Sequence, residues 1–190
     1  MKIPIGISAR HAHFTKEHLE ILFGENYKFE NFKDLSQPGQ FAATFKVTIE
    51  GPRNKIENVR ILGPERNYSQ VEITKTDAVT LGVNPPVRES GDVKESASLK
   101  VIGPAGEVVL EEGCIIASRH IHMHPLDLEE NDLDTDKIDV LIGNGKKTIL
   151  KNVSIKVSNF YKLELHLDTD DANASLVNQG DLAEVVDASE

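Results

Sequence analysis

The chain has 190 residues, of which 31 are acidic and 21 are basic, and its net charge is -10 with histidine counted as neutral. This length allows one large domain or two small ones, and the single cysteine, Cys114, excludes an intramolecular disulfide framework and a multi-cysteine zinc finger. A surface this acidic repels nucleic acid, and no apolar run approaches the roughly 20 residues that a membrane-spanning helix needs. The N-terminus has no apolar stretch of signal-peptide length, so we expect a cytoplasmic protein.

The N-terminal segment is predicted to form a strand that leads into a histidine pair and then into a helix. The pair is His11-Ala12-His13, and Thr15 can cap a helix over residues 16–23. The same order returns later in the chain, because residues 116–122 repeat the pattern of residues 7–13 and a helix over 126–130 can follow. Two copies of strand, histidine pair and helix predict a pseudo-symmetric site.

Between the two copies, and after the second one, short alternating or apolar segments end at glycine or Gly-Pro turns, which is typical of strands. These segments are residues 45–49, 56–62, 70–74, 99–102, 107–110, 138–142, 148–157 and 163–167. Strands this short favour antiparallel barrels or sandwiches over parallel β-α-β units. We therefore predict a mainly β fold of two small antiparallel β-barrels that share an interface, with a few short helices.

The two histidine pairs are the strongest functional signal in the sequence. On a strand, residues two apart point to the same face, so both imidazoles of His11-Ala12-His13 or of His120-Ile121-His122 can converge on one metal ion. One such pair is weak, since exposed or hydrogen-bonded histidines are the simpler interpretation. The duplicated Arg-His-x-His pattern is much more specific and predicts metal binding.

Two histidines do not complete a zinc site, which needs at least three protein ligands. His166 alternates on a predicted strand and can complete one site, whereas the other site calls for a carboxylate. Glu72 is the first candidate for that carboxylate, but the spacing alone leaves Glu164 and Asp168 open. His18 and His124 are interpreted as helix-end residues rather than ligands.

No signature of an enzyme with a nucleophilic side chain is present, because the chain lacks a Gly-x-Ser-x-Gly elbow. It also lacks the phosphate-binding P-loop. Cys114 lies among apolar residues and is interpreted as an inert core thiol. Three polar loops, at residues 36–41, 63–66 and 88–92, offer amides, hydroxyls and arginines instead. Together with a metal pair, these loops indicate a site for a small anion.

An ordered set of motifs between about residues 5 and 178 closely resembles the PduL-type phosphate acyltransferases, or phosphotransacylases. The motifs are Ile7-Ser8-Ala9-Arg10-His11-x-His13, Leu35 to Ala42, Glu57 to Arg66, Gln70-Val71-Glu72-Ile73, Leu81 to Asp92, Arg119-His120-Ile121-His122-Met123 and His166-Leu167-Asp168-Thr169-Asp170-x-Ala172-Asn173. The resemblance implies that the chain is an acyltransferase that interconverts acyl-CoA plus orthophosphate with acyl phosphate plus CoA.

The resemblance also implies an architecture and a metal site. One barrel is expected from residues 1–34 plus 115–190, and the other, side by side with it, from residues 35–114. Family members bind two zinc-type ions, and two ligand sets carry over by motif. These are His11, His13 and Glu72 for one ion, and His120, His122 and His166 for the other.

The remaining site residues follow from the same resemblance. Arg66 is expected to bind phosphate as the catalytic cation, together with Gln37, Gln40 and Ser90. CoA, a substrate here, is expected to meet Ser8, Arg10, Lys33, Arg60 and Asn173. Where relatives have a helix-capping Ser or Thr, this chain has His124, which is expected either to cap poorly or to be a spare metal-facing group.

The expected mechanism is direct attack of phosphate on the thioester carbonyl in a ternary complex. One alternative is a dinuclear metallohydrolase that acts on thioesters, and another is a non-catalytic scaffold or shell-associated protein in which zinc stabilises the barrels. The short segment before the first strand leaves no room for a microcompartment-targeting extension, so a cytosolic enzyme is expected. Neither the preferred acyl chain nor a homo-oligomeric state follows from the sequence.

Overall fold

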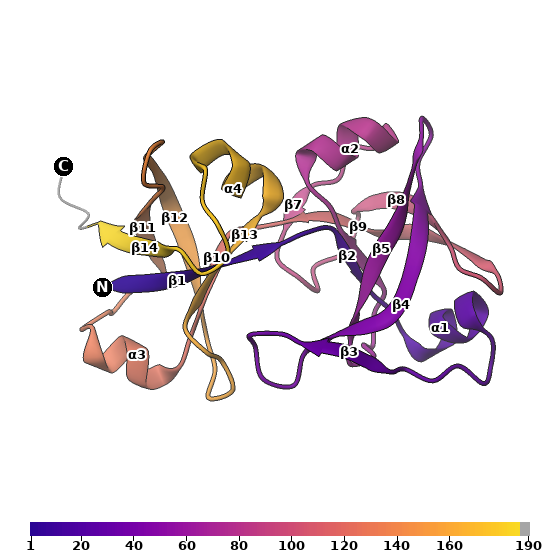
Figure 1. The fold of residues 1–190 in the computed structure, drawn as a ribbon, viewed down its shortest axis with the longest axis horizontal. Helices are drawn as coiled ribbons and strands as arrows, with labels where there is room; N and C mark the ends of the chain where they lie inside the picture. Colours follow the sequence, from indigo (N-terminus) through magenta and orange to yellow (C-terminus); the bar gives the residue numbers. More distant parts are fainter. Residues whose placement is uncertain (187–190) are drawn as a thin grey trace. The chain divides into compact units, whose positions relative to one another are not determined.

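The computed structural model describes residues 1–186, which form short strands and four short helices arranged in two compact units. Unit 1 contains Met1–Ser8, Ser36–Pro38 and the chain from Arg119 onward, and unit 2 contains Ala9–Leu35 and Gly39–Ser118. Figure 1 shows the elements of both units in chain order by colour. None of the helices within residues 1–186 has the length and apolar character needed to span a membrane.

Unit 1 is a closed barrel of six strands in the order β1-β13-β10-β12-β11-β14. The strands are β1 (Lys2–Ser8), β10 (His120–Met123), β11 (Lys137–Ile142), β12 (Thr148–Val157), β13 (Glu164–Asp168) and β14 (Leu182–Val186). Two short helices, α3 (Pro125–Glu130) and α4 (Thr169–Ser175), follow β10 and β13. Apolar residues from all six strands are buried inside the barrel, with Ile3, Ile121 and Leu165 fully buried.

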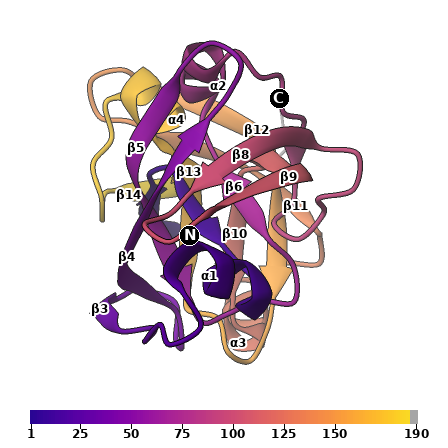
Figure 2. The ribbon, with the colours of Figure 1, turned by 90° about the vertical axis from the view of Figure 1, so that its right-hand side faces the viewer.

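Unit 2 is also closed by strand pairing, through the ring β4-β5-β2-β6-β9-β8. These strands are β2 (His11–His13), β4 (Phe41–Glu50), β5 (Lys55–Gly63), β6 (Gln70–Glu72), β8 (Ala97–Ile102) and β9 (Glu107–Ala117). Two further strands, β3 (Asn31–Asp34) and β7 (Val87–Arg88), pair with β4 and β9. The helices are α1 (Lys16–Phe23), which packs beside β9, and α2 (Lys75–Leu81); Figure 2 gives the clearer view of α1.

The two barrels follow one pairing scheme, which extends the sequence repeat to the whole fold. In each, the His-x-His strand pairs in parallel with one neighbour and antiparallel with another: β2 with β5 and β6, and β10 with β12 and β13. In unit 2, β6 pairs in parallel with β9, which belongs to the same copy of the repeat. In unit 1, the equivalent strand β13 pairs in parallel with the N-terminal strand β1. The start of the chain therefore completes the second copy of the repeat.

The mainly β, two-barrel fold is confirmed, with two differences in detail. Both barrels are mixed rather than purely antiparallel, because each contains two parallel pairs. The division of the chain also differs from the expected boundaries of 1–34 plus 115–190 and 35–114. Residues 9–34 and 115–118 lie in unit 2 because β2 and the end of β9 pair there, whereas residues 36–38 lie in unit 1.

Local signals explain which helices the sequence predicts. The Thr15 side chain caps α1 as expected, and Gly24, with φ of 90°, ends it. Helices α2 and α4 were not expected, because seven residues show little periodicity, but each has an N-cap side chain, Thr74 for α2 and Asp168 for α4. His124 caps α3 in a capping box with Asp127. The sequence had left open whether His124 caps the helix or faces a metal ion, and the structure gives it the capping role.

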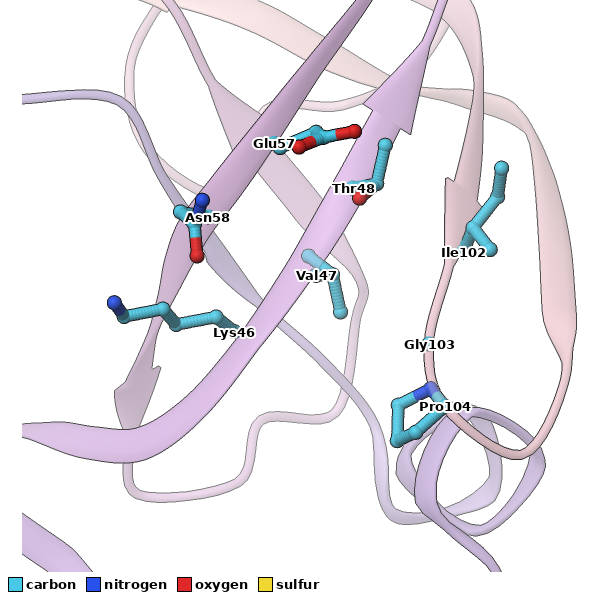
Figure 3. Close-up of a pocket in the computed structure, with 8 residues that line it drawn as sticks. All are labelled: Lys46, Val47, Thr48, Glu57, Asn58, Ile102, Gly103 and Pro104. Carbon is cyan, nitrogen blue, oxygen red and sulfur yellow. The ribbon is translucent and has the colours of Figure 1, made fainter.

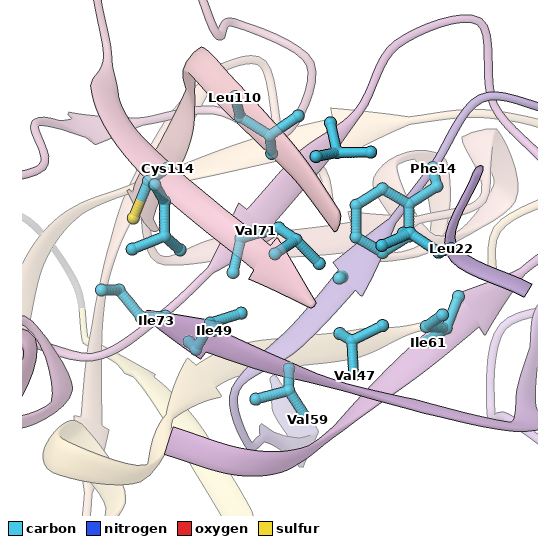
Figure 4. Packing of buried hydrophobic residues seen from close by; sticks show 14 of the residues in the cluster. Phe14, Leu22, Val47, Ile49, Val59, Ile61, Val71, Ile73, Leu110 and Cys114 are labelled. Carbon is cyan, nitrogen blue, oxygen red and sulfur yellow. The ribbon is translucent and has the colours of Figure 1, made fainter. Parts of the chain in front are cut away.

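The core of unit 2 contains the single cysteine. Figure 4 shows Cys114 among Val71, Ile73 and Leu110, and the thiol side chain is fully buried. Burial raises the pKa of the Cys114 thiol to about 12, because the surroundings cannot solvate a thiolate. Cys114 is therefore an inert core residue, as the sequence indicated.

This burial predicts the reactivity of the thiol. Cys114 should not react with a disulfide-exchange reagent in the folded protein at mildly alkaline pH, because the thiolate is the reactive species and burial excludes both it and the reagent. The same reagent should titrate one thiol per chain after unfolding in guanidinium chloride. The reaction is measured by absorbance, and a rapid reaction of the native protein would contradict the buried placement of Cys114.

Candidate metal centres

In unit 2, backbone pairing brings the first predicted ligand set together. β2 runs antiparallel to β6 with His11 opposite Glu72 and His13 opposite Gln70, so these four side chains lie on one face. The candidate ligand atoms of His11, His13 and Glu72 lie within 4.8 Å of one another. We call these three residues the unit 2 cluster. The structure thus brings Glu72 to the histidine pair, where the spacing alone had left several acids open.

In unit 1, the same pairing brings the second set together. β10 runs antiparallel to β13 with His120 opposite His166 and His122 opposite Glu164. The candidate ligand atoms of His120, His122 and His166 lie within 4.8 Å of one another, and we call these residues the unit 1 cluster. Asp168, the other acid considered as a ligand, instead caps α4 through a hydrogen bond from the Asp171 amide of 2.8 Å.

The residues of both clusters fit a divalent metal ion. Three histidines, or two histidines and a glutamate, are the donor sets of catalytic zinc sites that keep one position open. Within residues 1–186, the buried Nδ1 atoms of His13 and His122 find no hydrogen-bond partner. Burial lowers the pKa of both imidazoles to about 3, so both are neutral and carry a free lone pair at neutral pH. Such buried, unsatisfied nitrogens are what a metal ion would bind.

His11 is held in a defined orientation at the unit 2 cluster. Its Nδ1 lies 2.9 Å from the Ala9 carbonyl oxygen, and its Nε2 lies 3.5 Å from a carboxylate oxygen of Glu72. A proton on Nδ1 that bonds the carbonyl leaves Nε2 as the free ligand atom. Although burial alone would raise the pKa of Glu72, the neighbouring His11 and His13 hold it well below its usual range. Glu72 is therefore a carboxylate ready for a cation.

Ring stacking holds the histidines of the unit 1 cluster. The rings of His120 and His166 are nearly parallel, 5° apart, with centroids 4.9 Å apart. The Tyr161 ring stacks on His122 with a centroid distance of 3.9 Å and an angle of 11°. Tyr161 lies on the β12–β13 connection and was not expected from the sequence, since nothing in the local pattern distinguishes it from a loop tyrosine.

One further buried polar residue completes the set of four in each unit: Gln70, which the sequence reasoning missed, and Glu164, which it had considered only as a possible metal ligand. Gln70 precedes Glu72 by two residues on β6, and Glu164 precedes His166 by two residues on β13. Both are buried, with exposed fractions of 0% for Gln70 and 6% for Glu164. The alternation of a strand, which puts residues two apart on one face, was the signal that could have found Gln70 from Glu72.

Arg66 and Ser90 lie near the unit 2 cluster. The positive charge of Arg66 contributes to lowering the pKa of His13, and the Ser90 hydroxyl hydrogen-bonds both Glu72 and Gln70. The Arg66 guanidinium donates to the hydroxyl oxygen of Tyr68 over 2.6 Å, which fixes its position. The cation and the hydroxyl that the sequence expected to bind phosphate are thus next to the unit 2 cluster.

Gln37 has a different environment from the one expected of a phosphate ligand. Its side chain is 3% exposed, and its amide donates to the Lys162 carbonyl oxygen and to Glu164 while accepting from the Lys162 amide. Both amide atoms therefore hold the start of β13 in unit 1. Gln40 lies in the loop before β4, where its carbonyl oxygen accepts from the Leu35 amide over 3.0 Å. The phosphate role of these two glutamines stays a prediction.

The five residues expected at CoA are spread over both units. Lys33 and Arg60 lie in unit 2, where the Arg60 guanidinium lies 4.8 Å from the centre of the Phe32 ring. Ser8 ends β1 and Asn173 lies exposed on α4, both in unit 1. Arg10 lies in unit 2, where its guanidinium forms a two-point ion pair with Asp77. The CoA role of these residues stays a prediction.

Arg10 has an equivalent in the second copy of the repeat. Its guanidinium bonds Asp77, in the first turn of α2, over 2.8 and 2.9 Å, and Arg119 bonds Asp171, in the first turn of α4, over 2.7 and 2.8 Å. Each arginine precedes a His-x-His pair, and each aspartate lies just beyond the third ligand. Both ion pairs therefore tie the start of a His-x-His strand to the helix that follows its antiparallel neighbour.

A surface pocket of unit 2 contains no predicted site residue in its lining, although one lining residue, Lys46, pairs with Arg60 across β4 and β5. Figure 3 shows it between β4, β5 and the turn after β8, and its volume is about 260 Å³. It is lined by Lys46, Val47, Thr48, Glu57, Asn58, Ile102, Gly103 and Pro104, none of which was a candidate. The candidate site is thus defined by the two clusters and not by this pocket.

Comparison with known proteins identifies a matching family. The family model described as phosphate propanoyltransferase matches residues 4–178 of this chain. A phosphate propanoyltransferase of Thermotoga maritima is 50% identical over 187 residues, which is 97% of this chain and 89% of the relative. Those of Lachnoclostridium phytofermentans and Citrobacter koseri are 48% and 47% identical, over 97% and 91% of this chain and 87% and 83% of the relatives.

The two clusters predict the metal content of the protein. The purified chain, loaded with zinc and desalted, should hold two ions, because each cluster offers three ligands. Replacing one buried ligand in either unit, as in His13→Ala or His122→Ala, should leave one ion per chain. Elemental analysis of the three proteins measures this directly. Full metal content in both variants would show that the ions bind elsewhere.

Proposed function

Because the chain belongs to the phosphate propanoyltransferase family and is an acyltransferase, we propose that it transfers a short acyl group between CoA and orthophosphate. In this reaction, acyl-CoA and phosphate give acyl phosphate and CoA. The observation that carries the proposal is the pair of equivalent clusters, one in each unit. Arg66, held by Tyr68, lies near the unit 2 cluster. The acyl chain itself depends on a pocket shape that the family name does not determine.

We assign one zinc-type ion to each cluster, so that the reaction uses a dinuclear metal site. His11, His13 and Glu72 would hold one ion, and His120, His122 and His166 would hold the other. When bound, such ions act as Lewis acids that stabilise negative charge on the thioester and orient phosphate. The neutral state of His13 and His122 and the ionised state of Glu72 support this assignment.

Arg66 is proposed to bind phosphate. A guanidinium presents two parallel N–H groups to two phosphate oxygens, which lysine cannot do. The Tyr68 hydroxyl engages one end of the guanidinium, and the rest remains available to an anion. Ser90, Gln37 and Gln40 are kept as weaker candidates for phosphate, since the Ser90 hydroxyl donates to Glu72 in this structure.

The transfer is proposed to be direct. A phosphate oxygen attacks the thioester carbonyl carbon, the new carbon–oxygen bond forms, and the carbon–sulfur bond breaks to release CoA as a thiolate. No enzyme nucleophile is needed, and the one thiol of the chain is buried. The chain's contribution is to hold two anionic substrates together, which lowers the entropic part of the barrier. Ser8, Arg10, Lys33, Arg60 and Asn173 are proposed to bind CoA.

A second candidate function is thioester hydrolysis. The donor sets of the two clusters would also suit the activation of water, as in dinuclear hydrolases. The two functions differ in their products, because the transferase forms acyl phosphate in proportion to CoA and requires phosphate.

An assay that follows both products distinguishes them. With acetyl-, propanoyl- or butanoyl-CoA and phosphate, the protein should release CoA and form an equal amount of acyl phosphate, detected as hydroxamate. Release of CoA without acyl phosphate, at a rate independent of phosphate, would favour the hydrolase. The same panel of substrates gives the preferred acyl chain.

The role of Arg66 predicts a phosphate-specific defect. Arg66→Ala should raise KM for phosphate by about tenfold or more, since charge-assisted hydrogen bonds contribute roughly 1.5–3 kcal/mol. Arg66→Lys should restore only part of the loss. Arg53→Ala, which removes an exposed arginine of the same unit, serves as the control. Unchanged phosphate kinetics in Arg66→Ala would overturn the assignment.

A further inference from the structure

Each His-x-His strand faces two residues of its antiparallel neighbour, and only one of the two is an assigned ligand. Opposite the histidines of β2 lie Glu72 and Gln70, and opposite those of β10 lie His166 and Glu164. The pairing registers make Gln70 equivalent to Glu164 and Glu72 equivalent to His166. The two units thus share a fourth polar position, buried in both and occupied by a different side chain in each.

The environment of Glu164 is built to hold a carboxylate next to His166. Its Oε2 atom lies 3.2 Å from Nε2 of His166 and accepts hydrogen bonds from the Ser36 hydroxyl and the Gln37 amide. Space for the side chain depends on Gly6, since a Cβ atom there would lie 2.6 Å from the carboxyl carbon of Glu164. Burying a carboxylate is costly unless it is hydrogen-bonded, so these partners stabilise it at this place.

In unit 1, the candidate ligand atoms that lie close to one another belong to His120, His122 and His166. Glu164 is not one of these residues, so it lies beside the cluster and not in it. A carboxylate that contacts a ligand histidine orients its ring and increases its basicity. Glu164, 3.2 Å from Nε2 of His166, can act in this way when Nδ1 of His166 is the ligand atom. Its charge would also balance part of the charge of an ion held by three neutral imidazoles.

Gln70 occupies the equivalent place in unit 2 and contacts the third ligand of that cluster. Its amide nitrogen donates to Glu72 over 2.6 Å and to the Ser90 hydroxyl over 2.9 Å, and its carbonyl oxygen accepts from the Gly91 amide over 2.7 Å. Here the ligand itself is the carboxylate, and a neutral amide can donate to it. A second carboxylate at this distance would repel Glu72 and compete with it for a proton.

We infer that Glu164 and Gln70 are positioning residues that orient the third metal ligand of each unit, Glu164 acting on His166 and Gln70 on Glu72. This inference rests on the proposed function, because it takes both clusters to bind metal. Each cluster with its positioning residue contains one carboxylate, as a ligand in unit 2 and beside the ligand in unit 1. Ser36 and Gln37, at the start of the Ser-Gln-Pro-Gly-Gln motif, act in this account by holding Glu164.

The inference is tested in proteins that keep a single cluster. His13→Ala retains the unit 1 cluster and His122→Ala retains the unit 2 cluster, and Co²⁺ affinity is measured in each by competition with a chromogenic chelator. Glu164→Gln should weaken binding roughly 10–100-fold in the His13→Ala background and leave affinity in the His122→Ala background unchanged. Gln70→Met should have the opposite pattern, so each variant controls for the other.

Additional measurements separate positioning from folding. Circular dichroism and thermal melting of the metal-free proteins report whether each variant folds, and Glu130→Gln, at an exposed site in unit 1, controls for loss of an acid. The visible absorption of bound Co²⁺ should change in Glu164→Gln, since the field at the ion depends on ligand orientation. Ser36→Ala, which removes one donor to Glu164, should weaken Co²⁺ binding in the same background by a smaller factor.

The outcomes distinguish this inference from the proposed function. If neither single-cluster protein binds Co²⁺, both the assignment of the metal sites and this inference are wrong. If both bind it but Glu164→Gln and Gln70→Met retain the parent affinity and spectrum, only the positioning roles are wrong. Equal weakening at both clusters by either variant would indicate a general effect on folding and would also overturn the inference.

Discussion

The antiparallel register between each His-x-His strand and its neighbour is the constraint on which both candidate sites depend. Because strand side chains alternate, pairing His11 with Glu72 and His120 with His166 puts four polar side chains on one face in each unit. A shift of one residue would turn the third ligand away from the histidines. The chemistry proposed for this acyltransferase therefore rests on backbone hydrogen bonds that hold this register.

The same register explains how the two copies of the repeat have diverged. Both copies have an arginine before the histidine pair and an aspartate that it binds on the helix after the third predicted ligand, so the frame around each cluster is alike. The position of the carboxylate differs: in unit 2 it is the third proposed ligand, and in unit 1 it is the neighbour of the third proposed ligand. Unit 1 also takes β1 from the start of the chain, and Gly6 on that strand gives Glu164 its space. The first eight residues thus contribute to a candidate site whose predicted ligands lie more than a hundred residues later.

Much of this could be predicted from residues that act locally. Thr15 and Pro125 indicated α1 and α3, and the duplicated histidine pairs indicated metal binding, because capping and strand alternation depend on near neighbours. The parallel pairs β1 with β13 and β6 with β9 could not be predicted, since they join segments far apart in the chain. Gln37 was placed at phosphate by motif, and its buried hydrogen bonds to Lys162 and Glu164 became visible only in the fold.

The sequence by itself determined the ligand types, the two-barrel fold class and the family, because residue spacing on a strand and an ordered set of motifs are properties of the linear chain. Only the tertiary structure decided that Glu164 lies beside the unit 1 cluster, that Gln70 contacts Glu72 and that the Gln37 side chain is buried against Lys162 and Glu164. Those facts depend on register, burial and electrostatic surroundings. These arise when distant strands pair, and no local pattern contains them.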